Sequence, residues 1–273
     1  MITKILPIYD PTLFQGAISY YLQYRPRYPN ALYDLISQEF QLDGQGKLLD
    51  LGCGIGLVAI ALHHQFASVV GIDPDTEMLE VAKQEANLHH AQNITWIKGL
   101  AENIASEIGT FRLVTIGRAF HWMDKELVLQ RSYDLLDRTR EIKSGIAIIQ
   151  TEKDIWSNNS AWAQNVLAVI KRWLGEERRV GETSVPLLYK SDLEILDRSP
   201  FVGIKRHDID FQKYWTIDDF IGYLYSTAYC RRDYFNGNTS QFEAEIKSAI
   251  LAVEPSGQFV EDIPISVYFG FKD

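Results

Sequence analysis

The sequence has little of what several common classes of protein require. Only two cysteines are present, which excludes a disulfide framework, and no spacing of cysteine and histidine resembles a zinc site, so no metal is expected. No apolar run is long enough to span a bilayer, and no membrane partner is expected. Basic residues are outnumbered by acidic ones, and the net charge of −9 argues against a broad nucleic-acid surface. The expected partner is therefore a small-molecule substrate.

The rest of the composition is that of an ordinary globular protein. The chain has 273 residues and a hydrophobic fraction of 46%, enough for one large α/β domain or a domain with a lid. Pro7, Asp10 and Pro11 interrupt the stretch in which a signal peptide would need its apolar segment. We therefore expect a cytoplasmic protein. The sequence leaves its oligomeric state open between a monomer and a homodimer.

A glycine-rich segment lies between a predicted strand and a predicted helix. Residues 47–51 read as a buried strand, and apolar residues then recur at helical spacing over residues 55–62. Between them, Gly52, Gly54 and Gly56 permit a sharp turn and the close approach of a ligand. The start of the helix would present free N–H groups to that ligand. The alternative is a glycine-rich turn without a ligand.

Two residues of this segment indicate the kind of ligand. Leu57 stands where a dinucleotide-binding fingerprint would have its third glycine, which opposes a nicotinamide oxidoreductase, the main alternative enzyme class. Asp50 adds negative charge at the end of the strand, which suits a ligand with a positive end such as an ammonium or a sulfonium. The run Asp50-Leu-Gly-Cys-Gly-Ile-Gly56 resembles the first motif of class I S-adenosylmethionine (SAM)-dependent methyltransferases.

A second predicted strand, residues 68–73, also ends in a carboxylate. Asp73 follows Gly52 by about 20 residues, the spacing at which such a carboxylate meets ribose hydroxyls. A carboxylate accepts two hydrogen bonds from a diol, although a strand-end aspartate is often only a helix cap. Pro74 is expected at the first helical position, and Met78 would pack either on an adenine or in the core.

The resemblance implies SAM as the methyl donor and further contacts to it. In the family, an acidic residue and a backbone N–H in the loop after the third strand meet the adenine edge. Here Leu100 replaces the acidic residue, so Glu102 or the backbone around Ala101 would make the contact. Arg118, in the segment after the fourth strand, is predicted to face both cofactor and substrate.

Residues 24–29, Tyr-Arg-Pro-Arg-Tyr-Pro, resemble the entry segment of a methyltransferase group that includes trans-aconitate methyltransferase-like proteins. In that group the segment lies over the cofactor site. The resemblance implies a lid in which Tyr24, Arg25 and Tyr28 contact the substrate. On residue types alone, a surface arm packed by its own aromatic residues is the alternative.

Two later segments resemble substrate-facing parts of the family. Residues 119–124 match the family's segment after the fourth strand, which places His121 and Trp122 at the substrate. His121 would act as a base or orient the substrate, or it would bond only to its own loop. Residues 225–231 resemble a Ser-x-x-Tyr region near the family's substrate pocket, which adds Tyr229.

Four arginines are candidates to hold an acceptor carboxylate: Arg25, Arg27, Arg118 and Arg231. Guanidinium groups bind carboxylates through two hydrogen bonds, and an ionised carboxylate needs no base to accept a methyl group. The product would be a methyl ester. The alternatives are that these arginines are solvated or paired, that the acceptor is a hydroxyl, phenol or amine, or that the protein binds SAM without turnover.

The alternation of strands and helices predicts an α/β fold with a doubly wound, seven-stranded, mostly parallel Rossmann-like sheet. We expect a single domain over residues 1–273. Its parts would be an N-terminal lid or arm (1–46), a cofactor-binding core (47–151), a helical insertion after the fifth strand (152–200) and a C-terminal part with a closing β-hairpin (201–273). The tryptophans of the insertion are expected to pack in a core rather than form a substrate cage.

Overall fold

Seven strands form the central sheet of the part of the chain that the structure describes. This computed structural model describes residues 10, 13–138, 143–151, 153–180, 183–184 and 192–273. The strands follow the order β3 (Ile94–Lys98), β2 (Ser68–Asp73), β1 (Lys47–Leu51), β4 (Leu113–Gly117), β5 (Gly145–Thr151), β11 (Ile265–Phe271) and β8 (Val202–Ile209). The first five pair in parallel, whereas β11 is antiparallel to both neighbours. The predicted α/β class with a mostly parallel sheet is confirmed.

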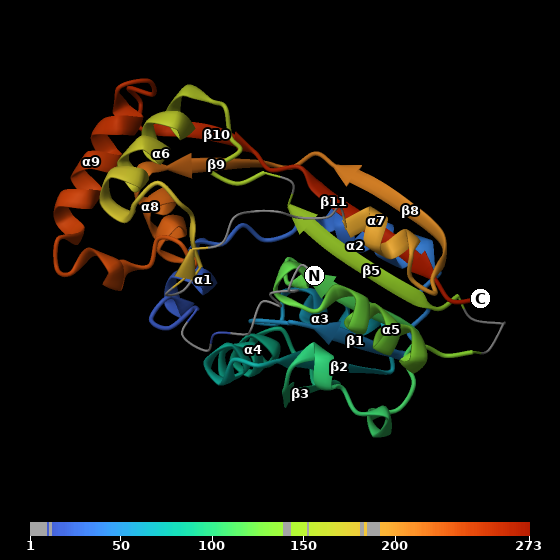
Figure 1. Cartoon of the computed structure of the whole chain (residues 1–273). Coiled ribbons are helices and arrows are strands. Elements are labelled where there is room, and N and C mark those ends of the chain that lie inside the picture. The colour runs from blue at the N-terminus through green and yellow to red at the C-terminus, as the bar shows by residue number, and fades with distance from the viewer. Residues whose placement is uncertain (1–9, 11–12, 139–142, 152, 181–182, 185–191) are drawn as a thin grey trace, which may run out of the picture.

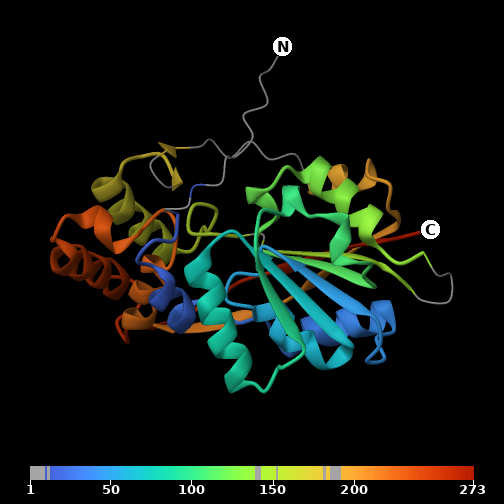
Figure 2. The same ribbon diagram turned by 90° about the horizontal axis from the view of Figure 1, so that it is seen from below.

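Helices cover both faces of this sheet (Figure 2). Successive residues of a strand point to opposite faces, and β1 therefore serves two cores. Leu48 lies in the cluster that contains α2 (Asn30–Phe40) and α3 (Leu57–Leu62), whereas Leu49 lies in the cluster that contains α5 (Lys125–Leu135). The remaining flanking helices are α4 (Thr76–Leu88), which contacts β2 and β3, and α7 (Asp192–Asp197), which contacts α5.

A helical lobe lies beyond one end of the sheet, as Figure 1 shows. It contains α6 (Ala161–Leu174), α8 (Ile217–Tyr225), α9 (Thr239–Leu251) and the antiparallel pair β9 (Gln212–Thr216) and β10 (Gln258–Asp262). A buried aromatic cluster holds these elements together, with Trp162, Trp215, Phe220, Phe242 and Phe259 among its members. Trp162 is therefore a core residue, as expected for the insertion. A further short pair, β6 (Arg179–Val180) and β7 (Thr183–Ser184), follows α6.

The lobe interrupts the C-terminal part of the sheet. β8 and β11 are antiparallel neighbours, but residues 210–264 lie between them in the chain and supply α8, α9, β9 and β10. The two strands form the antiparallel closing pair that the sequence predicts, but most of a lobe joins them rather than a turn. Only α6 of the three large lobe helices comes from the predicted insertion.

The N-terminal helix α1 (Ile18–Tyr24) packs against α8 of the lobe. Tyr24 lies against Gly222 of α8, where any side chain larger than hydrogen would collide with the tyrosine ring. Tyr20 stacks on Tyr24 and also contacts Tyr225 edge-on, with ring centroids 5.4 Å apart in the second pair. These contacts fix α1 against the lobe.

Parts of the predicted lid and insertion, residues 1–9, 11–12, 152, 181–182 and 185–191, lie outside the described residues. Each helix that the structure describes is too short or too polar to cross a membrane.

Candidate functional site

Two adjoining hollows lie where the loops after β1, β2, β3 and β4 meet. The larger encloses about 760 Å³ of space, part of it open to solvent, and the smaller about 300 Å³. The two share Tyr21, Gly52, Gly54, Gly117 and Arg118 in their linings. They therefore form one continuous site at the carboxyl ends of the strands, where ligands bind in open α/β sheets.

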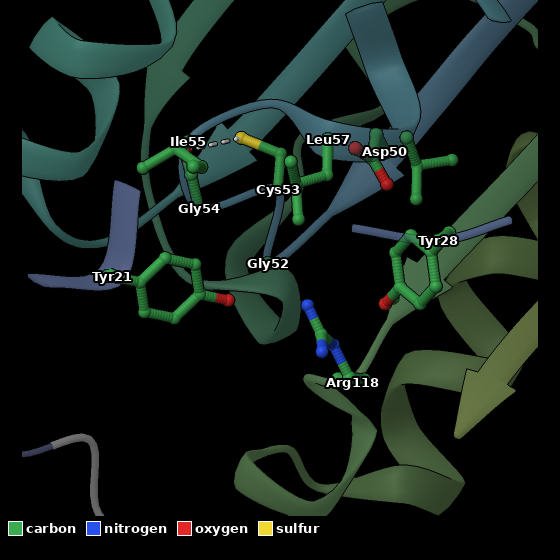
Figure 3. A pocket seen from close by; sticks show the side chains of 11 residues that line it. Tyr21, Tyr28, Asp50, Gly52, Cys53, Gly54, Ile55, Leu57 and Arg118 are labelled. Atoms are coloured by element: carbon green, nitrogen blue, oxygen red, sulfur yellow. Dashed lines mark hydrogen bonds between the residues drawn. The ribbon is translucent and has the colours of Figure 1, made fainter. Parts of the chain in front are cut away.

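Most of the predicted cofactor residues line the larger hollow. These are Gly52, Gly54, Asp73, Pro74, Met78, Ala101, Glu102 and Arg118, and the predicted substrate residue Trp122 lines it as well. The smaller hollow, drawn in Figure 3, adds Asp50 and Tyr28. Gly56, Tyr24, Arg25, His121 and Tyr229 line neither hollow.

Asp73 joins the first two loops of the site. Its Oδ2 accepts the backbone N–H of Gly54 at 2.8 Å, and its Oδ1 accepts the N–H of Asp75 at 2.9 Å. Burial raises the pKa of Asp73 to about 6, against the opposing effect of these two bonds, so the carboxyl is ionised at neutral pH. A carboxylate has about four acceptor positions, and two remain for a ligand.

Gly54 presents an open surface to the site. Its φ of 53° lies in the left-handed region, and a Cβ placed on it would have no atom within 4 Å. Since Gly54 lines both hollows, that open space is the site itself. Gly56 is different, because a Cβ there would lie 2.7 Å from Trp96 and 2.9 Å from Ile60. Packing against those side chains, rather than a ligand, requires the glycine at position 56.

Both carboxylate oxygens of Asp50 accept hydrogen bonds from neighbouring residues. Oδ1 accepts the hydroxyl of Thr115 at 2.8 Å, and Oδ2 accepts the N–H of Ala59 at 3.2 Å. Ala59 lies in the first turn of α3, whose N-cap residue Gly56 has no side chain to make that bond. Asp50 therefore caps α3 from the neighbouring strand. Burial raises its pKa to about 7, so at neutral pH the predicted negative charge is only partly present.

The residues around the predicted adenine region are held by contacts between loops. Glu102 accepts the backbone N–H of Asp124 at 2.8 Å, and this bond ties the loop after β3 to the loop after β4. α4 begins at Thr76, and Asp75 is its N-cap, because the side chain of Asp75 accepts the N–H groups of Glu77 and Met78. The prediction that Pro74 occupies the first helical position is therefore wrong. Leu100 lines the larger hollow and gives it an apolar surface where the family commonly has an acid.

The N-terminal segment contributes Leu13, Phe14 and Tyr21 to the wall of the larger hollow. None of the three is among the predicted site residues, because aromatic and aliphatic side chains are equally typical of a packed surface arm. Tyr28 is buried beside the smaller hollow, whereas Tyr24 packs between α1 and α8.

The structure separates the four candidate arginines. Arg27 pairs with Glu85, with 3.3 Å between the charged atoms, and Arg231 pairs with Asp233. Arg25 donates Nη2 to the carbonyl of Ser226 at 3.0 Å, and its guanidinium lies over the ring of Tyr21. Its Nε is buried and has no hydrogen-bond partner among the described residues.

Arg118 points into the site. Figure 3 shows its guanidinium directed toward the glycine-rich loop, with Tyr21 on one side and Tyr28 on the other. The guanidinium carbon lies 4.7 Å from the centre of the Tyr28 ring. Within the described part of the chain, its buried Nη2 has no hydrogen-bond partner. Its φ of 53° is unusual for a residue with a side chain, and such strain persists where the surrounding structure enforces it.

His121 is partly buried beside the indole of Trp122, with 4.6 Å between ring centroids. Burial lowers its pKa to about 3, and the positive charges of Arg178, Lys125 and Arg25 lower it further. The imidazole is therefore neutral at pH 7 and a weak base, whereas an efficient general base has a pKa near the working pH.

Arg178 is a residue that the sequence did not single out. Its guanidinium lies 5.7 Å from the ring centre of Trp156 and 5.4 Å from that of Tyr229, and it is close enough to His121 to lower its pKa. In the sequence it belongs to the charged run Gly175-Glu-Glu-Arg-Arg179, which is typical of a solvated surface. Only the fold brings it near His121 and Tyr229.

Comparisons with known proteins identify a methyltransferase domain in this chain. A family model described as a methyltransferase domain matches residues 48–139. A putative methyltransferase of Dictyostelium discoideum is 28% identical over 250 residues, which cover 90% of this chain and 89% of that protein.

Two solved structures share the fold. A putative methyltransferase from Bacillus halodurans has a TM-score of 0.55 and 19% identity, over 89% of this chain and 99% of that one. A phosphoethanolamine N-methyltransferase of Haemonchus contortus, solved with phosphomonomethylethanolamine and S-adenosylhomocysteine, has a TM-score of 0.52 and 16% identity, over 94% and 57% of the two chains. The family model and the relative that matches over most of its length show that the chain contains a SAM-dependent methyltransferase domain of class I.

Proposed function

We propose that this methyltransferase binds SAM in the larger hollow and transfers its methyl group to a carboxylate of a small molecule. The class I fold implies SAM, and the residues present suit it. Gly54 leaves open space where a side chain would stand, Asp73 retains two acceptor positions, and Leu100 and Met78 provide an apolar surface. These are the features that a ribose and an adenine require.

When bound, SAM supplies an activated methyl group, and transfer to a carboxylate breaks a carbon–sulfur bond, forms a carbon–oxygen bond and leaves a neutral thioether without removal of a proton. The protein then has to align the acceptor and exclude water. Phe14 and Tyr21 cover the larger hollow from the N-terminal segment. Asp73 would hold the ribose hydroxyls, and Arg118, which lines both hollows, lies where an acceptor group would meet the cofactor.

The main support for a carboxylate acceptor is the buried Nη2 of Arg118, which has no hydrogen-bond partner among the described residues. A buried donor without a partner costs about 1–3 kcal/mol, which an acceptor oxygen of the ligand would remove. Arg25 supplies a second such nitrogen close by, since its guanidinium lies over Tyr21, another residue of both linings.

The low pKa of His121 favours the same acceptor. A hydroxyl or a protonated amine must lose a proton on methylation, and a neutral imidazole with a pKa of about 3 removes protons poorly. A carboxylate is already ionised at neutral pH. The likeness of residues 24–29 to trans-aconitate methyltransferase-like proteins agrees with an acidic acceptor. We also propose cytoplasmic action as a monomer or homodimer.

Calorimetry with SAM, and separately with NAD(H), is the first test of the cofactor. Micromolar SAM affinity without NAD(H) affinity is the expected result. Transfer of labelled methyl groups to a panel of small carboxylates, alcohols and amines then tests the acceptor. Arg118→Gln should raise the KM for a carboxylate at least about tenfold, whereas Arg27→Gln, which removes an exposed arginine paired with Glu85, should leave it unchanged. Transfer only to alcohols or amines would reject the carboxylate proposal.

A further inference from the structure

A corner of the helical lobe contains three buried hydrogen-bond donors without partners. They are Nε of Arg178, Nε1 of Trp156 and the hydroxyl of Tyr229, and none of them has a hydrogen-bond partner among the described residues. Tyr229 is only 5% exposed, so bulk solvent does not supply the hydrogen-bond partner that its hydroxyl lacks. The rings of Trp156 and Tyr229 meet edge to face with centroids 4.5 Å apart, and Arg178 lies against both.

Asp154 holds this corner in place. One of its oxygens pairs with Nη1 of Arg178 at 3.0 Å, while the other accepts the backbone N–H groups of Trp156 and Ser157 at 3.0 and 3.2 Å. The ion pair fixes the guanidinium and leaves its Nε unsatisfied. The hydrogen bonds from the backbone of Trp156 and Ser157 to Asp154 fix the position of the indole. The donors are therefore positioned before any ligand arrives, which reduces the entropy lost on binding.

The corner is connected to the proposed acceptor site through His121, whose ring centroid lies 4.6 Å from that of Trp122 in the lining of the larger hollow. Arg178 and Arg25 are both close enough to His121 to lower its pKa. The guanidinium of Arg25 lies 5.5 Å from the ring centre of Tyr223, and Tyr223 in turn raises the pKa of Tyr229 after the larger effect of burial. The arginine of the lobe and the arginine of the N-terminal segment thus approach the same region from two sides.

We propose that Arg178, with Trp156 and Tyr229, binds a second anionic group of the acceptor, so that the preferred acceptor carries two anionic groups. This rests on the proposed function, in which the first group meets Arg118 and Arg25. Arg178 Nε and Trp156 Nε1 only donate hydrogen bonds, and the tyrosine hydroxyl donates as well, so the fitting partner is an oxyanion, either carboxylate or phosphonate. Arg178 is then a specificity-determining residue.

Binding of matched acids to the full-length protein, in the presence of S-adenosylhomocysteine, tests this proposal. The probes are the linear dicarboxylates from succinate to pimelate, the monocarboxylates in which a methyl group replaces one carboxylate, and 4-phosphonobutyrate. We expect at least one dianion to bind about tenfold or more tightly than its matched monocarboxylate, the range of one charge-assisted hydrogen bond. The comparison of glutarate with 4-phosphonobutyrate distinguishes carboxylate from phosphonate.

Two variants and a control assign the effect to the corner. Arg178→Gln should abolish the preference for the dianion and leave the affinity for the monocarboxylate and for S-adenosylhomocysteine unchanged. Tyr229→Phe removes only the unpartnered hydroxyl and should reduce the preference severalfold without loss of the fold. Arg172→Gln removes an arginine of α6 that pairs with Glu245 on the exposed surface, and it should retain the full preference.

The possible outcomes separate this inference from the proposed function. A preference that survives in Arg178→Gln overturns the inference, as does a wild-type protein that binds S-adenosylhomocysteine but shows no preference for any dianion. In both cases the proposed cofactor site stands. A wild-type protein that fails to bind S-adenosylhomocysteine rejects the proposed function, and the inference falls with it.

Discussion

Gly54 donates its backbone N–H to Oδ2 of Asp73 at 2.8 Å, so the glycine-rich loop is bound to the carboxylate that is proposed to hold the ribose. The loop after β1 and the end of β2 therefore form one unit. A ligand that contacts Asp73 necessarily lies against the open face of Gly54, because the two residues line the same hollow. This pairing makes the cofactor site sensitive to small changes at either position.

Replacement of Asp73 by Asn should weaken SAM binding at least about tenfold, because an amide has one acceptor oxygen where the carboxylate has two. In the wild type, the affinity should also decline as the pH falls through about 6, where the buried carboxyl becomes protonated. Calorimetry between pH 5 and 8 measures both effects. Glu80→Gln, on the exposed side of α4, is the control and should bind normally. Equal affinity of Asp73→Asn and wild type would contradict the ribose role.

Alanine at positions 54 and 56 should have different effects. Gly54→Ala places a methyl group in the open space of the site, so we expect SAM affinity to fall about tenfold or more, with a backbone strain of about 1–2 kcal/mol. Gly56→Ala carries the same backbone strain and also collides with Trp96 and Ile60, so it should be the less stable variant. Thermal unfolding with and without SAM separates the two, and the reverse order of stability would refute this interpretation.

Asp50 should make the unfolding free energy depend on pH. Its pKa is raised from 3.8 to about 7 by burial, so between these values the folded protein retains a proton that the unfolded chain has lost. Stability should therefore fall as the pH rises from about 4 to 7, by up to about 1.4 kcal/mol per pH unit from this group alone. Denaturant unfolding across this range should show a shallower dependence in Asp50→Asn. An identical slope in the two proteins would argue against a buried neutral carboxyl.

His121→Ala should change kcat by less than about tenfold on a carboxylate acceptor. The imidazole is neutral, its pKa is about 3, and no proton leaves an ionised carboxylate on methylation. The pH profile of kcat should accordingly be flat between about 6 and 8. A loss of about 100-fold or more would instead indicate general-base catalysis by His121. Steady-state kinetics of the wild type and the variant, measured with the same acceptor, decide between the two.

Local patterns of the sequence were sufficient to predict the sheet core and the residues that line the proposed cofactor side of the site. β2 has the predicted bounds, residues 68–73, because a short apolar run that ends in a carboxylate and a proline leaves little freedom in where a strand stops. The position of Asp73 follows from the same pattern, since parallel strands bring their carboxyl ends to one edge of the sheet. Gly54 was predicted from the spacing of the glycines alone.

Only the tertiary structure decided the roles of the arginines and of Gly56. Arg27 and Arg231 have the same residue type as Arg118, but their partners Glu85 and Asp233 occupy them, and the partner of Arg27 lies far away in the chain. Gly56 belongs to the cofactor motif, yet the packing of Trp96 from a different strand accounts for it.

The acceptor side of the site depends on the tertiary structure for the same reason. The lobe is built from two segments of the chain, one before β8 and one between β8 and β11, and its packing brings Trp156, Arg178 and Tyr229 together near His121. The sequence thus determined the residues of the proposed cofactor site, because strand ends fix their positions locally. The proposed acceptor site was decided by the long-range packing of the lobe, which no local pattern of residues encodes.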